Sequence, residues 1–162
     1  MNDPSSNPAD RSAPLVPTAA PALAGAVQLR VRYCECDPMG VAHHAAYAPW
    51  LEIARTELLR GSGVSYADME RAGVFLVITR LECRYRRPVY YDDLVEVRTR
   101  ITGGSRVKLE HEYEIVVVED GGHGSRGPRT LGEHVTAAAT TLVCVGRDGR
   151  VQPLPEWLTP GA

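Results

Sequence analysis

The sequence predicts an α+β fold in which a curved antiparallel sheet wraps around one long central helix. Three observations predict it. Apolar residues recur at helical spacing in one segment near residue 50, whereas most of the chain after residue 74 alternates apolar and polar residues as strands do. The connections between these later segments are mostly short, which favours antiparallel pairing. One helix is then needed to cover one face of the sheet.

The chain of 162 residues is long enough for one domain with a substantial core. Its first 26 residues are rich in proline, alanine and serine, and bury too little apolar surface to offset the entropy of ordering. We therefore expect a flexible tail over residues 1–26 and a single domain over residues 27–162. The early charge of the tail is acidic, at Asp3, so the tail lacks the basic start of a secretion signal.

Charge and cysteine usage narrow the class of partners. The net charge of −2 argues against nucleic acid or an anionic membrane as a partner. The sequence has no run of about 18 apolar residues, so no membrane span is expected. The cysteines are scattered and resemble no disulfide framework, which predicts free thiols and a cytoplasmic location. They are Cys34, Cys36, Cys83 and Cys144.

The first half of the domain is expected to form a strand, a turn and two helices. Residues 27–34 alternate as a half-buried strand, and the Pro-Met-Gly sequence at 38–40 favours a turn. The period changes at His44, and apolar residues then follow one face of a helix of about four turns. Gly61 and Gly63 end that helix, and Ser65 caps a short one through Arg71.

The second half is expected to be strands over residues 74–91, 94–101, 107–118 and 136–146. Two of them have clear apolar faces, which comprise Val95, Val97, Thr99 and Ile101, and Leu109, His111, Tyr113 and Ile115. His111 is therefore expected to be an interior or interface residue with its hydrogen bonds satisfied. The glycine-rich connector at 119–130 is expected to be mobile.

The stretch "CECDPMGVAHH" at 34–44 combines several reactive side chains. Cys34 and Cys36 have C-x-C spacing, which is not the C-x₂₋₄-C spacing of a structural zinc site, so no metal is expected. Asp37 has two possible roles. Aspartate favours a D-P-x-G turn through bonds to its own backbone, and it is also a possible catalytic carboxylate.

The spacing from Asp37 to the helix supports the catalytic reading. Asp37 lies seven residues before His44, so the unpaired N–H groups of the first helical turn would point toward the space beside it. A carbonyl placed there would meet donors at its oxygen and a carboxylate near its carbon. Acyl transfer needs this arrangement. Either the His44 side chain orients water or the acyl group, or only its backbone contributes.

The motif "YCECDPMGVAHHAAY" followed by "LEIARTELL" resembles the signature of hotdog-fold acyl-CoA thioesterases. The resemblance covers residues 27–155 and is strongest to the 4-hydroxybenzoyl-CoA and Tol-Pal-associated branch. It implies that Asp37 attacks the thioester or activates water, that the backbone near His44 polarises the carbonyl, and that the His44 side chain contributes. It places substrate-binding positions at Gly40, Val41, His43 and Tyr47. His43 stands where relatives commonly carry tyrosine or tryptophan.

The resemblance also implies an acyl-CoA substrate, homodimers joined edge to edge, often homotetramers, and no cofactor. The loop "GGSRVK" at 103–108 exposes backbone N–H groups beside two cations, which suits an anion. The corresponding loop in the family contacts CoA, which implicates Ser105, Arg106 and Lys108.

Other possibilities stay open at this point. An acyl carrier protein is an alternative to CoA as the thiol carrier. A hotdog hydratase or dehydratase would carry an Asp-x-Asn-Pro-x-His-type motif, which is absent from the sequence. A non-catalytic acyl-thioester binder would keep the fold without turnover.

Overall fold

The computed structural model describes residues 17, 19, 22–122 and 131–159. The tail predicted over residues 1–26 lies largely outside these described residues, and so does the tip of the connector predicted over 119–130. In the part of the chain that the structure describes, no helix has the length and apolar character needed to cross a membrane.

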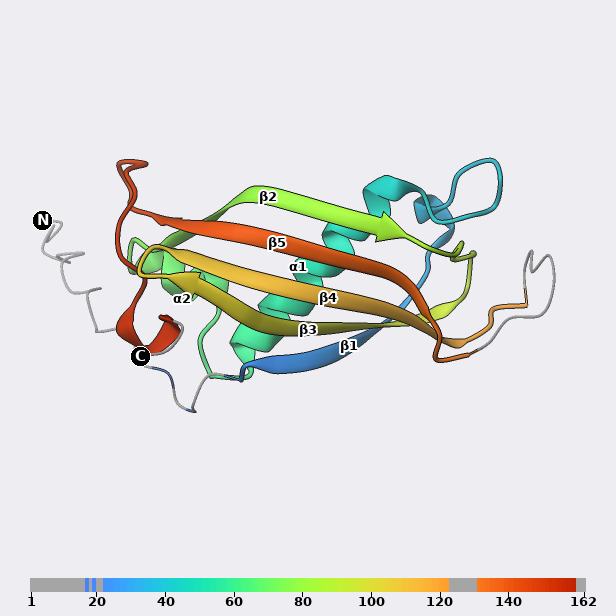
Figure 1. The fold of residues 1–162 in the computed structure, drawn as a ribbon, viewed down its shortest axis with the longest axis horizontal. Coiled ribbons are helices and arrows are strands. Elements are labelled where there is room, and N and C mark those ends of the chain that lie inside the picture. Colours follow the sequence, from blue (N-terminus) through green and yellow to red (C-terminus); the bar gives the residue numbers. More distant parts are fainter. Residues whose placement is uncertain (1–16, 18, 20–21, 123–130, 160–162) are drawn as a thin grey trace, which may run out of the picture.

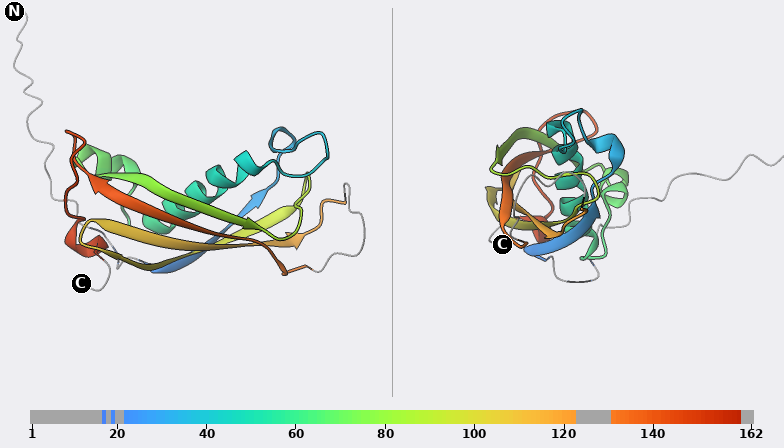
Figure 2. Two further views of the ribbon diagram at one scale, coloured as in Figure 1. Left: turned by 45° about the horizontal axis from the view of Figure 1, so that its top comes forward. Right: turned by 90° about the vertical axis from the view of Figure 1, so that its right-hand side faces the viewer.

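The described residues form a five-stranded antiparallel sheet with the order β1-β3-β4-β5-β2. The sheet curves around one long helix, which lies on its concave side (Figures 1 and 2). This confirms the predicted α+β architecture. The elements are β1 (Ala24–Arg30), α1 (His44–Arg60), α2 (Tyr66–Arg71), β2 (Phe75–Tyr85), β3 (Leu94–Ser105), β4 (Lys108–Glu119) and β5 (His134–Val145), with 3₁₀ turns at Tyr33–Glu35 and Glu156–Leu158.

The core lies between α1 and the concave face of the sheet. Trp50 and Leu51 of α1 pack there in one cluster with Val95 and Val97 of β3 and Ile115 of β4. These side chains are at most 1% exposed. The predicted apolar faces of the two strands are confirmed, because their inward residues are buried or half-buried while their neighbours are mostly exposed. Burial of these apolar side chains of α1 is the main source of the helix's stability.

The first strand differs from the prediction at both ends. It runs from Ala24 to Arg30 and not over residues 27–34, because a 3₁₀ turn begins at Tyr33. The Glu35 carboxylate accepts the Arg32 N–H at 2.8 Å and so stabilises that turn. Cys34 therefore lies in this turn and not at the end of a strand, as the predicted range of 27–34 had placed it.

Strand β2 forms one edge of the sheet and exposes apolar side chains along its length. Val77, Ile78, Leu81 and Tyr85 are 47%, 38%, 41% and 52% exposed. An exposed apolar edge strand is a ready template for pairing with another chain.

Candidate active site

The segment from Cys36 to Ala42 forms a tight turn that carries Asp37. The Asp37 N–H donates to the Val41 carbonyl and the Gly40 N–H donates to the Asp37 carbonyl, each at 2.9 Å. Gly40 has φ of 78°, which glycine adopts without steric cost. The Asp37 Oδ1 accepts the Met39 N–H at 2.8 Å, so this side chain is a turn-former. Its Oδ2 accepts no hydrogen bond from the described residues, which leaves that oxygen available for chemistry.

A buried carboxylate, Glu35, attaches this turn to the central helix. Its Oε1 accepts hydrogen bonds from Trp50 Nε1 at 3.0 Å and from the Arg32 guanidinium at 2.6 Å, and its carbonyl accepts the His43 N–H at 2.7 Å. Burial would raise the pKa of Glu35, but the hydrogen bonds from Arg32 and Trp50 outweigh it and lower that pKa. Glu35 therefore stays ionised and fixes the turn relative to α1.

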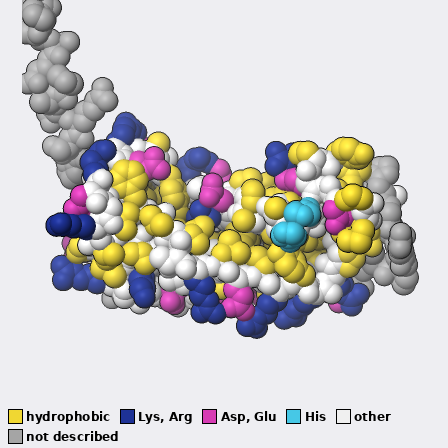
Figure 3. Space-filling model, turned by 90° about the horizontal axis from the view of Figure 1, so that it is seen from above, with side chains coloured by type: hydrophobic (Ala, Val, Ile, Leu, Met, Phe, Trp, Pro, Cys, Tyr) yellow, Lys and Arg dark blue, Asp and Glu magenta, His cyan; other side chains and the backbone are white. Residues whose placement is uncertain are grey.

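The N-terminus of α1 follows directly on the turn that carries Asp37. The helix begins at His44, as predicted, and His43 is its N-cap, with Nδ1 accepting the Ala45 N–H at 3.2 Å. The His44 N–H has no acceptor among the described residues. It lies at the positive end of a 17-residue helix dipole, which favours developing negative charge. The two imidazole rings lie 3.9 Å apart, and Figure 3 shows histidine side chains beside hydrophobic ones on this face.

A cavity of about 300 Å³ opens next to the helix N-terminus. His44 and Tyr47 of α1 line it, together with the end of β2 and the turn that carries Asp37. The remaining lining residues are Val41, Ala42, Tyr85, Arg86, Arg87 and Pro88. The ring centroid of Tyr47 lies 4.8 Å from that of Trp50 and 4.8 Å from that of Tyr85. Burial raises the pKa of Tyr47 to about 12, so Tyr47 serves as a neutral wall.

The predicted CoA loop lies at the opposite end of the sheet. Ser105 ends β3 and Lys108 begins β4, whereas Leu94, at the other end of β3, pairs with Arg30 near the Asp37 turn. A strand of 12 residues spans roughly 36 Å. Within one protomer, Val41, His44 and Tyr47 line the cavity, Asp37 and Gly40 lie on the turn that carries Val41, and His43 directly precedes the helix. Asp37 itself is not among the residues that line the cavity, and Ser105, Arg106 and Lys108 lie at the other end of the sheet.

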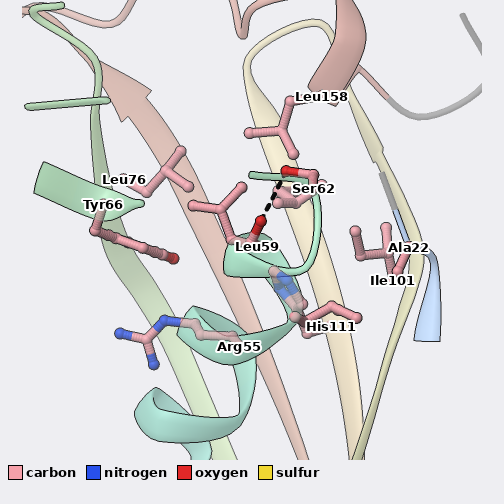
Figure 4. A pocket seen from close by; sticks show the side chains of 11 residues that line it. Ala22, Arg55, Leu59, Ser62, Tyr66, Leu76, Ile101, His111 and Leu158 are labelled. Atoms are coloured by element: carbon pink, nitrogen blue, oxygen red, sulfur yellow. Dashed lines mark hydrogen bonds between the residues drawn. The ribbon is translucent and has the colours of Figure 1, made fainter. Parts of the chain in front are cut away.

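A second, smaller cavity of about 20 Å³ lies near the C-terminal end of α1. Its polar lining includes Arg55, Tyr66 and His111 among aliphatic side chains (Figure 4). The Arg55 Nη2 donates to Glu52 at 2.7 Å. Nε and Nη1 of Arg55 and Nδ1 of His111 have no partner in the described part of the chain. His111 is interior, as predicted, but the expectation that its hydrogen bonds are satisfied is wrong at Nδ1. The cavity has room for about one water molecule.

His111 makes stability depend on pH. Burial, and then the charge of Arg55, lowers the pKa of His111 to about 4. As pH falls from about 6.5 toward 4, His111 is therefore protonated in the unfolded chain but stays neutral in the folded chain, which favours unfolding. We expect this residue to cost roughly 3 kcal/mol of folding stability between pH 7 and pH 4. Urea unfolding of wild type and His111→Gln across this range measures it. The variant should lose less stability on acidification. The surface variant His134→Gln is the matched control, and equal losses in His111→Gln and wild type would contradict the expectation.

A curved sheet around a long helix, with a carboxylate on the turn before the helix N-terminus, defines the hotdog fold with a site suited to thioester chemistry. The sequence profile of the Thioesterase-like superfamily matches residues 31–160. This chain belongs to that superfamily, which confirms the prediction of a thioesterase.

Individual relatives agree with this assignment. YneP of Bacillus subtilis, whose name places it provisionally among acyl-CoA thioesterases, is 29% identical over 82% of this chain and 91% of its own length. The acyl-CoA thioester hydrolase YbgC of Escherichia coli O157:H7 is 34% identical over 57% of this chain and 69% of its own length. The crystal structure of a DHNA-CoA thioesterase from Staphylococcus aureus is similar with a TM-score of 0.68 and 32% identity, covering 81% and 79% of the two chains.

Sequence reasoning missed two features of this site. Glu35 and Trp50 are 15 residues apart and meet only because the strand end folds back against the helix. No role in the site was expected for Arg86, yet it lines the cavity. Its position directly after the alternating residues of β2 could have indicated this, but only the fold shows that this strand end lies at the cavity.

Proposed function

We propose that this protein hydrolyses acyl-CoA thioesters at the cavity beside the α1 N-terminus, with Asp37 as nucleophile or general base. Two features support the proposal. Asp37 Oδ2 accepts no hydrogen bond from the described residues, and the His44 N–H, seven residues later at the start of α1, has no acceptor among them. The reaction is R–CO–S–CoA plus water giving R–COOH and CoA–SH. The carbonyl oxygen gains negative charge as its carbon is attacked, and the helix N-terminus stabilises that charge.

Two routes use the same residues. Asp37 attacks the carbonyl carbon, expels the CoA thiolate and forms an anhydride that water cleaves, or Asp37 takes a proton from the water that attacks. In both routes the thiolate leaves with the bonding electrons and is protonated. His44 lines the cavity, and its imidazole would orient water or the acyl group. Gly40 and Val41 shape the turn, His43 caps the helix, and Tyr47 forms the pocket wall.

We assign the chain to the 4-hydroxybenzoyl-CoA and Tol-Pal-associated branch of these enzymes. The motif from Tyr33 to Leu59 supports this, because the Asp-x-x-Gly-Val turn, His44 and Tyr47 fall in register with that branch. The cavity of about 300 Å³ lies at the small end of the range for ligand pockets, which favours a compact acyl group.

We further propose that the protein is a dimer joined through β2, consistent with its exposed apolar side chains. Two β2 strands paired antiparallel would set the β3–β4 turn of one protomer at the same end as the Asp37 turn of the other. Ser105, Arg106 and Lys108 would then serve the partner's site by binding CoA phosphates. The cations Arg106 and Lys108 form no ion pair in the described residues, which leaves them available for an anion.

The test is release of free thiol from a panel of acyl-CoA thioesters, from acetyl to palmitoyl together with benzoyl and 4-hydroxybenzoyl. We expect turnover with a preference for compact acyl groups. Because Cys34 is exposed and free, a control with enzyme alone corrects the thiol signal. A folded protein that releases no thiol from any of them would contradict the proposal.

A further inference from the structure

The active-site cavity contains a cation that the proposed hydrolysis does not use. Arg86 lines it together with His44 and Tyr47. Its backbone is anchored just past the end of β2, because the N–H groups of Arg86 and Arg87 both donate to the Val135 carbonyl, at 2.9 and 3.1 Å. Arg86 is exposed and lines the cavity where the thioester would bind.

Arg86 differs from its neighbours in having no acidic partner in the described residues. Arg84 pairs with Glu82 at 2.7 Å and Arg87 pairs with Glu133 at 2.8 Å. The cavity lining contains no carboxylate, so the charge of Arg86 is not balanced there. The other lining residues are His44, the ion-paired Arg87, and Val41, Ala42, Tyr47, Tyr85 and Pro88, and these last five suit an apolar body. A ligand that fills this cavity best therefore has an apolar body and an anionic group.

From these observations, and resting on the proposed thioesterase function, we propose that Arg86 selects acyl groups that carry a carboxylate. The position of Arg86 decides between the two possible anions of such a substrate. The CoA phosphates lie at the far end of the pantetheine arm, away from the reacting carbonyl. Arg86 shares a small cavity with the helix N-terminus that would hold that carbonyl. The carboxylate of a short dicarboxylic or aromatic acyl group lies within its reach.

The experiment compares thioesters matched in chain length, glutaryl-CoA against valeryl-CoA and adipoyl-CoA against hexanoyl-CoA. For each pair, the specificity ratio is kcat/KM with the carboxylated group divided by kcat/KM with the neutral one. In Arg86→Met this ratio should fall roughly 10- to 100-fold, the range expected for losing a charge-assisted hydrogen bond. Arg86→Lys should retain most of it. Arg84→Met, which removes a paired arginine outside this cavity, should keep the wild-type ratio.

Two outcomes would overturn the proposal. One is an unchanged ratio in Arg86→Met. The other is an equal rise in KM for both members of a pair that disappears with pantetheine thioesters, because this would assign Arg86 to the CoA phosphates. Non-hydrolysable thioether analogues of glutaryl-CoA and valeryl-CoA, titrated by calorimetry, give the same comparison without turnover. Absence of thiol release would thus refute the proposed hydrolysis, whereas equal Arg86 effects on the two analogues would refute the acyl selectivity.

Discussion

Replacing Asp37 with asparagine should reduce kcat/KM by at least about a hundredfold, the scale of losing a positioned acid, base or nucleophile. Asparagine keeps an oxygen that can accept the Met39 N–H, so the turn from Cys36 to Ala42 should persist. What it loses is the negative charge on the oxygen that would attack the carbonyl or take a proton from water. The measurement is thiol release with the best substrate of the panel, by wild type and variant side by side.

The matched control for this substitution is Asp148→Asn. Asp148 also accepts a hydrogen bond within its own turn, from the Arg150 N–H at 3.0 Å, but lies at the other end of the sheet, past the end of β5. The Asp148→Asn variant should retain wild-type kcat/KM. A circular dichroism melt shows whether Asp37→Asn is folded at the assay temperature. Near-wild-type turnover by a folded Asp37→Asn would remove Asp37 from the mechanism.

Replacing Leu81 with aspartate should separate the proposed dimer into monomers. Leu81 is 41% exposed near the middle of the edge strand β2, and a two-fold axis would bring two introduced carboxylates into one interface. Loss of a central interface contact costs about 2 kcal/mol, which weakens association roughly thirtyfold. Activity should fall with dissociation, because each site would lose the partner's Ser105, Arg106 and Lys108. Sedimentation velocity over a range of protein concentrations measures the assembly.

The control for Leu81→Asp is Val151→Asp. Val151 is 61% exposed but lies outside β2, so the variant introduces the same charge away from the proposed dimer interface. It should remain dimeric and active. A wild-type protein that is monomeric and active at every concentration would contradict both the proposed interface through β2 and the proposed role of Ser105, Arg106 and Lys108 in the partner's site.

The helix and its neighbouring turn were predictable because their signals are local. The apolar stripe from Tyr47 to Leu58 and the seven-residue step from Asp37 to His44 each depend on residues within a few turns of one another. The inward faces of β3 and β4 follow from the strand period in the same way.

The remaining features depend on which parts of the chain, distant in sequence, the fold brings together or separates. The segment "GGSRVK" was predicted from its residues to bind an anion, but its location could not be predicted, because β3 extends through Ser105 and carries the loop away from Asp37. The interior position of His111 followed from its register. Its Nδ1 has no partner in the part of the chain that the structure describes. The strand pattern could not predict this, because it depends on the residues of other elements that pack beside His111.

The backbone hydrogen bonds of the Asp37 turn have a consequence for how this enzyme can diversify. Val41 and Ala42 are bonded through their carbonyl and amide, to the Asp37 N–H and the Val89 carbonyl. Both residues line the cavity, but Ala42 also belongs to the buried core, whereas Val41 is half-buried and forms the turn through its backbone. Substitutions at Val41 can therefore reshape the pocket while the carboxylate stays in place. A lineage with this turn can acquire new substrates by small sequence changes without losing the reaction.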